Sequence, residues 1–212
     1  MKKLLFPILI VLVGTMVLPQ NIFAQGCLEA DIIVAVDWSN SVSSKRQEMV
    51  DALYTYSRAF TLRKDGIKLG ILSFGDTSRI EAPITSDTNY IDLGLASLFS
   101  DKAGNSTRCG EIPGYASVLF NQSASERGKI PEKRFLIFIS DGDVENKDYV
   151  AQDFLTFAAS QNVVVCAIQI NSDLAIERSA TKFMRDIATP GFYFTSSYSK
   201  IQSFLRTLDL CM

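Results

Sequence analysis

The stretch "DIIVAVDWSNS", residues 31–41, joins a run of apolar residues to a short polar segment. The run "DIIVAV" (31–36) is apolar at nearly every position rather than at alternate ones, which is typical of a strand that is covered on both faces. Asp37, Ser39 and Ser41 follow directly after it. If the chain turns there, one carboxylate and two hydroxyl groups lie close together, and this set of oxygens predicts a site for a hard cation.

Apolar runs alternate with helical patterns along the rest of the chain, which indicates βαβ units around a mainly parallel sheet. Strands are predicted over 31–36, 67–75, 78–84, 133–140, 163–170 and 192–195, and helices over 43–60, 89–99, 115–126, 147–160, 173–188 and 198–209. Segment 78–84 follows the preceding strand after the short turn "GDT", too closely for a helical crossover, so we expect an antiparallel edge strand. The predicted fold is a doubly wound, Rossmann-like α/β sheet with one antiparallel edge strand and helices on both faces.

Three polar segments are expected to meet at one edge of this sheet. In an open parallel sheet, ligands bind beyond the carboxyl ends of the strands, where the strand order reverses. The segments are "DWSNS" (37–41), the polar loop 100–114 that contains "NSTRCG", and "SDGD" (140–143) after the strand 133–140. Asp and Ser also favour turns and helix starts, which would explain each segment separately. It would not explain why all three segments are expected to meet at one edge of the sheet.

These segments resemble the metal-ion-dependent adhesion site of the von Willebrand factor type A domain family. That site combines the pattern Asp-x-Ser-x-Ser, a Thr from a distant loop, and an Asp that is commonly followed by Gly. The residues of this chain that match it are Asp37, Ser39, Ser41, Thr107 and Asp141. The resemblance covers residues 29–210 and implies the fold described above.

The threonine loop departs from the family pattern. A Gly often stands two residues before the Thr, whereas here Asn105 holds that position and Gly104 lies one residue further back. Ser106 is therefore an alternative to Thr107 as the hydroxyl ligand.

The resemblance implies a divalent cation and a protein partner. Mg²⁺ prefers six oxygen ligands and keeps several waters, which suits hydroxyls with one or two carboxylates, and Mn²⁺ or Ca²⁺ would also fit. Two carboxylates only balance the charge of the cation, so it still attracts an acidic group from outside. A Glu or Asp of a protein ligand would complete the coordination.

Two neighbouring residues are candidates for contact with that ligand. Trp38, the only tryptophan, either presents an aromatic binding surface or packs against a neighbouring loop. Arg108 either pairs with an incoming carboxylate or is simply solvated.

The first 24 residues resemble a secretory signal, because Lys2 and Lys3 precede an apolar stretch that ends near Ala24. The apolar core is about 15 residues, short of the roughly 20 that span a bilayer, so no stable membrane span is expected after cleavage. Residues 25–212 are then a single domain of a secreted or extracytoplasmic protein. "AQGC" also resembles a bacterial lipoprotein signal, which would make Cys27 a lipid anchor.

Export would expose four cysteines to an oxidising compartment. Cys27 and Cys211 lie at the two ends of the predicted domain, and domain termini often lie close together, so we expect a disulfide between them. Cys166 lies in a strand that is apolar on both faces and is expected to be a buried thiol, although a bridge from Cys109 to Cys166 is an alternative.

The composition excludes several classes of function. The formal net charge is −2, and no run of Lys or Arg remains to bind nucleic acid. The chain contains no His, so mechanisms that need a histidine base or ligand are excluded, and an enzyme is not expected. The predicted function is an exported module that binds a protein ligand through a cation. The alternatives are a structural subunit of a surface assembly and, less favoured, a metal-dependent hydrolase.

Overall fold

In the computed structural model, the described residues are 29–59, 62–63, 66–100, 104–170 and 178–208. The predicted signal segment 1–24 lies outside them, as do Cys27 and Cys211. The signal, the lipid anchor and the terminal disulfide therefore remain predictions.

One six-stranded sheet runs through the centre of the molecule, with the strand order β3-β2-β1-β4-β5-β6. The strands are β1 (Ala30–Asp37), β2 (Ile67–Phe74), β3 (Arg79–Thr85), β4 (Lys133–Ser140), β5 (Val164–Ile170) and β6 (Tyr193–Ser196). Strand β3 pairs antiparallel with β2 at one edge, and every other pair is parallel. The predicted edge strand is therefore confirmed.

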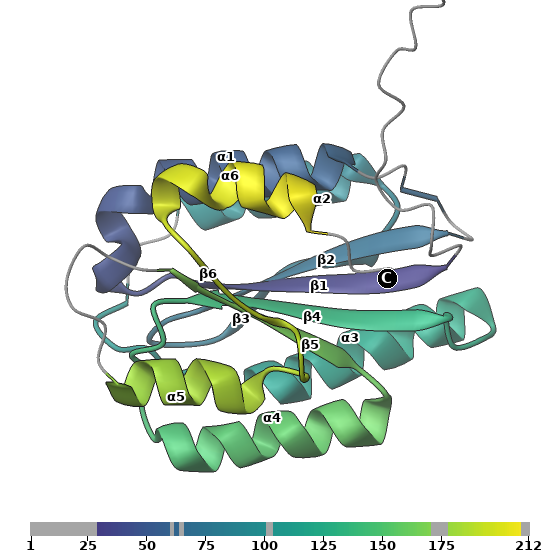
Figure 1. Ribbon diagram of the computed structural model, residues 1–212. Helices are drawn as coiled ribbons and strands as arrows, with labels where there is room; N and C mark the ends of the chain where they lie inside the picture. Colours follow the sequence, from purple (N-terminus) through teal and green to yellow (C-terminus); the bar gives the residue numbers. More distant parts are fainter. Residues whose placement is uncertain (1–28, 60–61, 64–65, 101–103, 171–177, 209–212) are drawn as a thin grey trace, which may run out of the picture.

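Helices cover both faces of the sheet, which confirms the doubly wound fold. The helices are α1 (Arg46–Ala59), α2 (Thr88–Ser100), α3 (Ile112–Arg127), α4 (Lys147–Gln161), α5 (Arg178–Ile187) and α6 (Tyr198–Thr207). In Figure 1, α1, α2 and α6 lie above the sheet and α3, α4 and α5 lie below it.

Two helix starts differ from the sequence prediction. A 3₁₀ helix over Asn40–Lys45 precedes α1, where the sequence predicted an α-helix from residue 43. Helix α3 begins at Ile112, three residues earlier than predicted, so the predicted loop 100–114 was too long. Pro113 lies in the first turn of α3, where a backbone N–H has no helical partner to lose, and Ile112 is fully buried.

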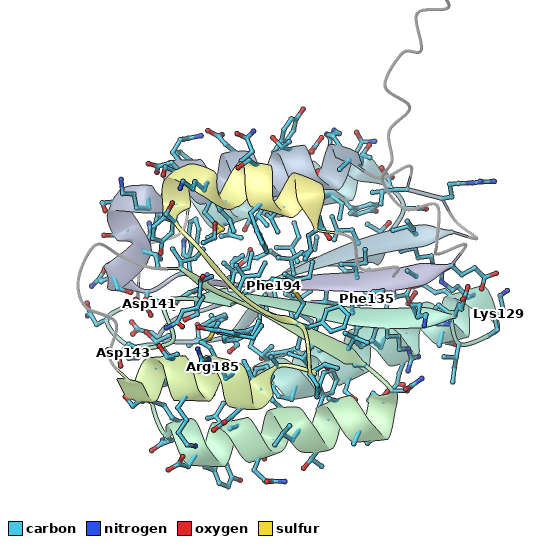
Figure 2. The ribbon with its side chains drawn as sticks, in the orientation of Figure 1. Lys129, Phe135, Asp141, Asp143, Arg185 and Phe194 are labelled. Atoms are coloured by element: carbon cyan, nitrogen blue, oxygen red, sulfur yellow. The ribbon has the colours of Figure 1, made fainter. Side chains whose placement is uncertain are left out.

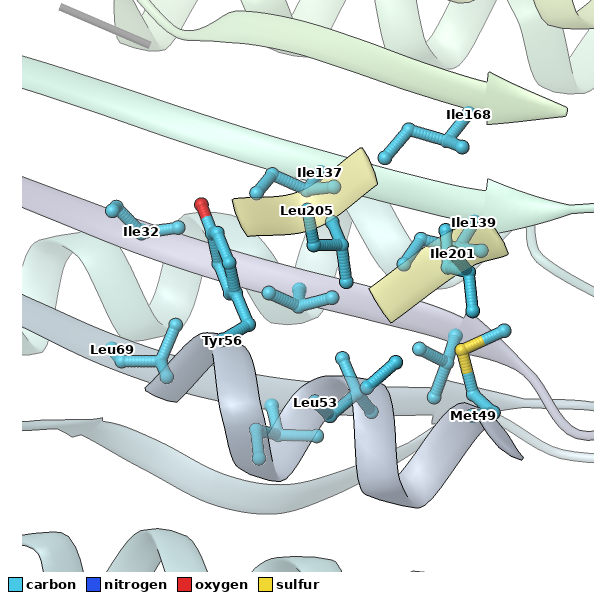
Figure 3. Close-up of a cluster of buried hydrophobic side chains, with 14 of the residues drawn as sticks. Ile32, Met49, Leu53, Tyr56, Leu69, Ile137, Ile139, Ile168, Ile201 and Leu205 are labelled. Atoms are coloured by element: carbon cyan, nitrogen blue, oxygen red, sulfur yellow. The ribbon is translucent and has the colours of Figure 1, made fainter. Parts of the chain in front are cut away.

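The apolar side chains of β1 contribute to two separate hydrophobic cores, because successive side chains of a strand point to opposite faces of the sheet. Ile32, Val34 and Val36 pack with the α1 and α6 side chains on one face, and Ile33 and Ala35 pack with the other core. Figure 3 shows the first core, in which Met49, Leu53 and Tyr56 of α1 and Ile201 and Leu205 of α6 cover the sheet. Burial on both faces is the physical reason why 31–36 is not an alternating pattern.

Cys109 and Cys166 are both free and fully buried. They belong to different cores, Cys109 to the one beneath α3 and α4 and Cys166 to the one beneath α1 and α6. The alternative of a bridge between them is wrong, because the sheet separates the two sulfurs, while the buried thiol predicted at Cys166 is confirmed. Burial raises the pKa of Cys166 to about 12 and raises that of Cys109 further.

Candidate metal site at the switch point

Strand order reverses between β1 and β4, the two central strands. From β1 the chain crosses to β2 on one side, and from β4 it crosses to β5 on the other. Asp37 is the last residue of β1 and Ser140 is the last residue of β4. In Figure 2, Asp141 and Asp143 lie at this end of the sheet and Lys129 lies at the opposite end. The position is the one at which α/β sheets bind ligands.

The carboxylate of Asp37 is buried and held by two donors. Its exposed fraction is 1%. Oδ1 accepts a hydrogen bond from the backbone N–H of Ser39 at 3.0 Å, and Oδ2 accepts one from the hydroxyl of Ser140 at 2.7 Å. Burial, and then the charge of Asp141, raises the pKa of Asp37 to about 6, against the lowering effect of these hydrogen bonds. A buried carboxylate that repels a second one is a site that a cation would relieve.

Ser39 and Ser41 present their hydroxyls together. The two Oγ atoms are 2.9 Å apart, with Ser39 buried and Ser41 exposed. Ser39 is the N-cap of the 3₁₀ helix, in an extended conformation, and Ser41 is the second residue of that helix. The arrangement matches the sequence prediction of a tight cluster of oxygens.

The threonine loop is joined to the β1 turn by backbone and side-chain contacts. Ser39 and Gly104 form a parallel β-bridge, and the side chain of Asn40 donates to Asn105 at 2.6 Å. A Cβ added to Gly104 would lie 2.3 Å from the backbone nitrogen of Asp76, so only glycine fits there. Gly104 is thus required at this close approach, one residue before the position at which the family pattern often has its glycine.

The choice between Ser106 and Thr107 follows from their partners. Asp76 accepts hydrogen bonds from both the N–H and the hydroxyl of Ser106, at 2.8 and 2.9 Å. Thr107 is 9% exposed, and its carbonyl accepts from the N–H of Glu145 at 3.0 Å, which connects this loop to the segment after β4. Because the Ser106 side chain is directed at Asp76, Thr107 is favoured as the ligand.

Asp141 lies at a turn that several contacts hold in place. Its Oδ1 accepts from the N–H of Asp143 at 3.0 Å, and its backbone carbonyl accepts from the side chain of Gln169 at 3.0 Å. Gly142 follows with φ = 87°, a conformation that favours glycine, and its N–H donates to Ser140 Oγ at 2.9 Å. The charge of Asp141 contributes to the raised pKa of Asp37, as expected for two carboxylates at the same end of the sheet.

Two residues were predicted to contact the protein ligand. For Trp38, the prediction of an exposed aromatic surface is wrong. The indole is 4% exposed and packs in the core, with the guanidinium of Arg46 4.8 Å from the ring centre. It therefore presents no aromatic surface, and the packed alternative holds. A strand end between two buried ligands directs the intervening side chain to the opposite side.

Arg108 is exposed, and its Nε donates to Glu145 at 3.2 Å. Both residues line a cavity of about 590 Å³. Asp76, Glu111 and Glu145 also line this cavity, so its walls carry more negative than positive charge. Arg108 thus pairs with a neighbouring acid rather than standing free for an incoming carboxylate.

The donor set fits a small, hard cation. It combines two carboxylates with the hydroxyls of Ser39, Ser41 and Thr107, all oxygen donors of the kind that Mg²⁺ and Mn²⁺ prefer. Within the described ranges, no group of three or more His, Cys, Asp or Glu side chains is placed to hold a metal.

Two residues of this region were missed by sequence reasoning. Ser140 orients Asp37, and Gln169 contacts the backbone of Asp141. The signal for Gln169 was available, because it is the only side chain in β5 that is neither apolar nor a thiol, and it is fully buried. Ser140 stands in the "SDGD" segment but reads as an ordinary turn residue.

A family model for the von Willebrand factor type A domain matches residues 31–207. Among curated proteins, the human collagen alpha-5(VI) chain is 26% identical over 163 residues, which are 74% of this chain and 6% of the collagen chain. The chain therefore corresponds to a small part of that relative.

Solved structures share the fold at low identity. Proximal thread matrix protein 1 from the mussel byssus, solved with a zinc-occupied MIDAS motif, has a TM-score of 0.66 and 20% identity, covering 85% of this chain and 47% of that one. The manganese-loaded TRAP protein of Plasmodium vivax has a TM-score of 0.64 and 16% identity, covering 84% and 73%. No helix in the described part of the chain is long and apolar enough to cross a membrane.

Proposed function

The chain belongs to the von Willebrand factor type A domain family, and from this premise we propose that it is an exported binding module. In this proposal it recognises a protein ligand through a divalent cation, and a Glu or Asp of the ligand completes the coordination. The cation is Mg²⁺, with Mn²⁺ or Ca²⁺ as substitutes, and the ligands are Asp37, Ser39, Ser41, Thr107 and Asp141.

The single observation that carries the proposal is the state of Asp37. This carboxylate is buried at the switch point, beside the paired hydroxyls of Ser39 and Ser41 and within the influence of Asp141. Burying a carboxylate beside a second, partly exposed one is costly unless a cation or an equivalent partner compensates the charges. A turn with only a structural role would not require a buried carboxylate.

Each residue of the proposed metal site would contribute in a defined way. The bound cation would supply an electrophilic centre for an external carboxylate. Ser39, Ser41 and Thr107 would hold it without adding negative charge, so that the site keeps affinity for an acidic ligand. Ser140 and the Ser39 N–H would fix the orientation of Asp37.

The similar proteins support an adhesion or matrix setting. They include a collagen chain, a byssal thread matrix protein and a pilus adhesin, SpaC of Lactobacillus rhamnosus. Since the first two are components of extracellular matrices, a structural role within a surface assembly is the second candidate. In that role the cation would stiffen the loops without contacting a ligand.

The first test is calorimetric titration of the purified, metal-free protein with Mg²⁺ and with Mn²⁺. We expect one saturable site that is lost in Asp37→Ala and in Asp141→Ala. The matched control is Asp143→Ala, an exposed acid nearby that we do not assign to the site, and it should bind like the wild type. A folded wild-type protein that takes up neither cation would refute the metal site.

The second test separates ligand recognition from a structural role. A display library of random peptides is selected on the protein in Mg²⁺ and eluted with a chelator. We expect the recovered peptides to carry a Glu or Asp whose change to Gln or Asn abolishes binding. If the protein binds Mg²⁺ but recovers no such peptide, the structural role replaces the binding module.

A further inference from the structure

A buried amide connects the turn that carries Asp141 to the edge of the sheet. Gln169 lies in β5, opposite Ser140 of β4 in the parallel register. Its side chain is 0% exposed, next to the buried apolar side chains of Val165 and Ala167 on the same face. A buried amide in such a place needs partners for both of its ends.

Both ends are satisfied, and the partners determine how the amide is oriented. Nε2 donates to the backbone carbonyl of Asp141 at 3.0 Å, and Oε1 accepts from the hydroxyl of Tyr193 at 2.7 Å. Since a carbonyl can only accept, the nitrogen must face Asp141 and the oxygen must face Tyr193. Tyr193 lies in β6 and is covered by the guanidinium of Arg185 of α5, 5.1 Å from the ring centre. Figure 2 labels Arg185 and Asp141 on the left of the view, with Arg185 below Asp141.

Helix α5 packs closely against the same Asp141–Gly142 turn. A Cβ added to Gly142 would lie 2.9 Å from the carbonyl oxygen of Ala180 and 2.9 Å from the side chain of Met184. The Asp141–Gly142 turn is therefore held by β5 through Gln169 and by α5 through direct packing. Arg185 of α5 also contacts Tyr193, the partner of Gln169, so the two supports are in contact with each other.

We propose that Gln169, braced by Tyr193, is a positioning residue for Asp141 in the metal site. The inference rests on the proposed function and deepens it. Neither side chain would touch the cation. Gln169 would hold the Asp141 peptide so that its carboxylate stays directed at the space shared with Asp37. Ligand geometry must be maintained to within about 0.5 Å, and loss of such an outer contact typically lowers metal affinity 10–100-fold.

The test compares three variants of the purified protein by titration with Mg²⁺ and by thermal unfolding without metal. Gln169→Met keeps the approximate shape of the side chain but removes both hydrogen bonds, and we expect Mg²⁺ affinity about 10-fold lower. Tyr193→Phe removes only the brace, and we expect a smaller loss, about 3-fold. Thr189→Val is the control, because Thr189 Oγ1 accepts from the Val165 N–H at the other end of β5. It should lower the melting temperature without changing the affinity for Mg²⁺.

The affinity for Ca²⁺ supplies a readout that a merely stabilising role would not move. Ca²⁺ tolerates irregular geometry better than Mg²⁺, so Gln169→Met should weaken Ca²⁺ binding less than Mg²⁺ binding. Unchanged Mg²⁺ affinity in folded Gln169→Met, or in folded Tyr193→Phe should the first variant not fold, would overturn the inference. A wild-type protein without Mg²⁺ binding would instead overturn the proposed function itself, so the two failures are distinct.

Discussion

The hydroxyl of Ser140 donates a hydrogen bond to the carboxylate of Asp37, with Oγ and Oδ2 2.7 Å apart. The same oxygen accepts from the N–H of Gly142 at 2.9 Å. One side chain thereby joins the ends of the two central strands and orients the buried acid. It also lowers the pKa of Asp37 against the larger effect of burial.

We expect Ser140→Ala to weaken Mg²⁺ binding about 10-fold, because the Asp37 carboxylate loses the donor that orients it. Calorimetric titration measures the change. Ser160→Ala is the control, since that hydroxyl donates to a carbonyl within α4, away from the site. Equal affinity of the two variants would contradict the role given to Ser140.

Asp37→Asn should stabilise the metal-free protein at neutral pH. With a folded pKa of about 6 and an unfolded value near 3.9, only the unfolded state is ionised at Asp37 between these pH values. A rise in pH through that window therefore favours unfolding, by on the order of 3 kcal/mol in total from this group. The asparagine variant does not lose this stability. Its free energy of unfolding relative to the wild type should therefore rise from pH 4 to pH 6 and then stay constant.

The measurement is urea unfolding of chelator-treated wild type and Asp37→Asn across that pH range. Asp143→Asn, which removes an exposed acid next to the site, serves as the control. A stability difference between wild type and Asp37→Asn that does not vary with pH would count against the raised pKa.

Gly104→Ala should abolish Mg²⁺ binding. Its Cβ would lie 2.3 Å from the backbone nitrogen of Asp76, so the loop that carries Thr107 must move away from the β1 turn. We expect a cost of about 1–3 kcal/mol in folding stability as well. Gly114→Ala is matched to it, because a Cβ there meets nothing within 4 Å and lies inside α3. That control should gain about 0.5–1 kcal/mol and bind Mg²⁺ normally, as urea unfolding and titration would report.

Arg127→Met should destabilise the protein without affecting the cation. Arg127 pairs with Asp31 at 2.7 Å, and the side chains are 2% and 0% exposed. Removal of one partner from a buried pair typically costs about 3–5 kcal/mol, because the other charge remains buried. Lys129→Met, at an exposed pair with Glu29, should cost less than about 1 kcal/mol. Chemical unfolding of both variants would show whether burial decides the difference.

The number of thiols that react after unfolding tests the proposed disulfide between Cys27 and Cys211. Burial and the raised pKa values of Cys109 and Cys166 should make both unreactive in the native protein. Unfolding without a reductant should then release two reactive thiols, counted with a chromogenic disulfide reagent. Four thiols would show that the terminal cysteines are not bridged.

The sequence by itself determined the architecture. The apolar runs 32–36 and 135–139 indicated strands covered on both faces, and the short "GDT" turn indicated an antiparallel neighbour; both consequences were found. Local patterns suffice for such features because they follow from the periods of helix and strand and from the reach of a short connection. For the same reason, "DWSNS" and "SDGD" could be identified from their position after strands, whereas Thr107 was matched through the family resemblance.

Helix starts were less predictable, since tertiary packing decides them. Nothing in the pattern distinguished the 3₁₀ turn of residues 40–45 from the first turn of α1, and α3 starts at Ile112 because that side chain is buried against the sheet.

Only the tertiary structure decided which of several chemically similar side chains faces the candidate site. Trp38 was equally consistent with an exposed or a packed ring, and it is buried. Ser106 and Thr107 both offered a hydroxyl, and the hydrogen bonds of Ser106 to Asp76 separated them. Ser140 and Gln169 contact residues 103 and 28 positions away, and only the fold identifies those partners. Local sequence determines which chemical groups are available, but their orientation, burial and pKa depend on neighbours that the fold brings from distant parts of the chain.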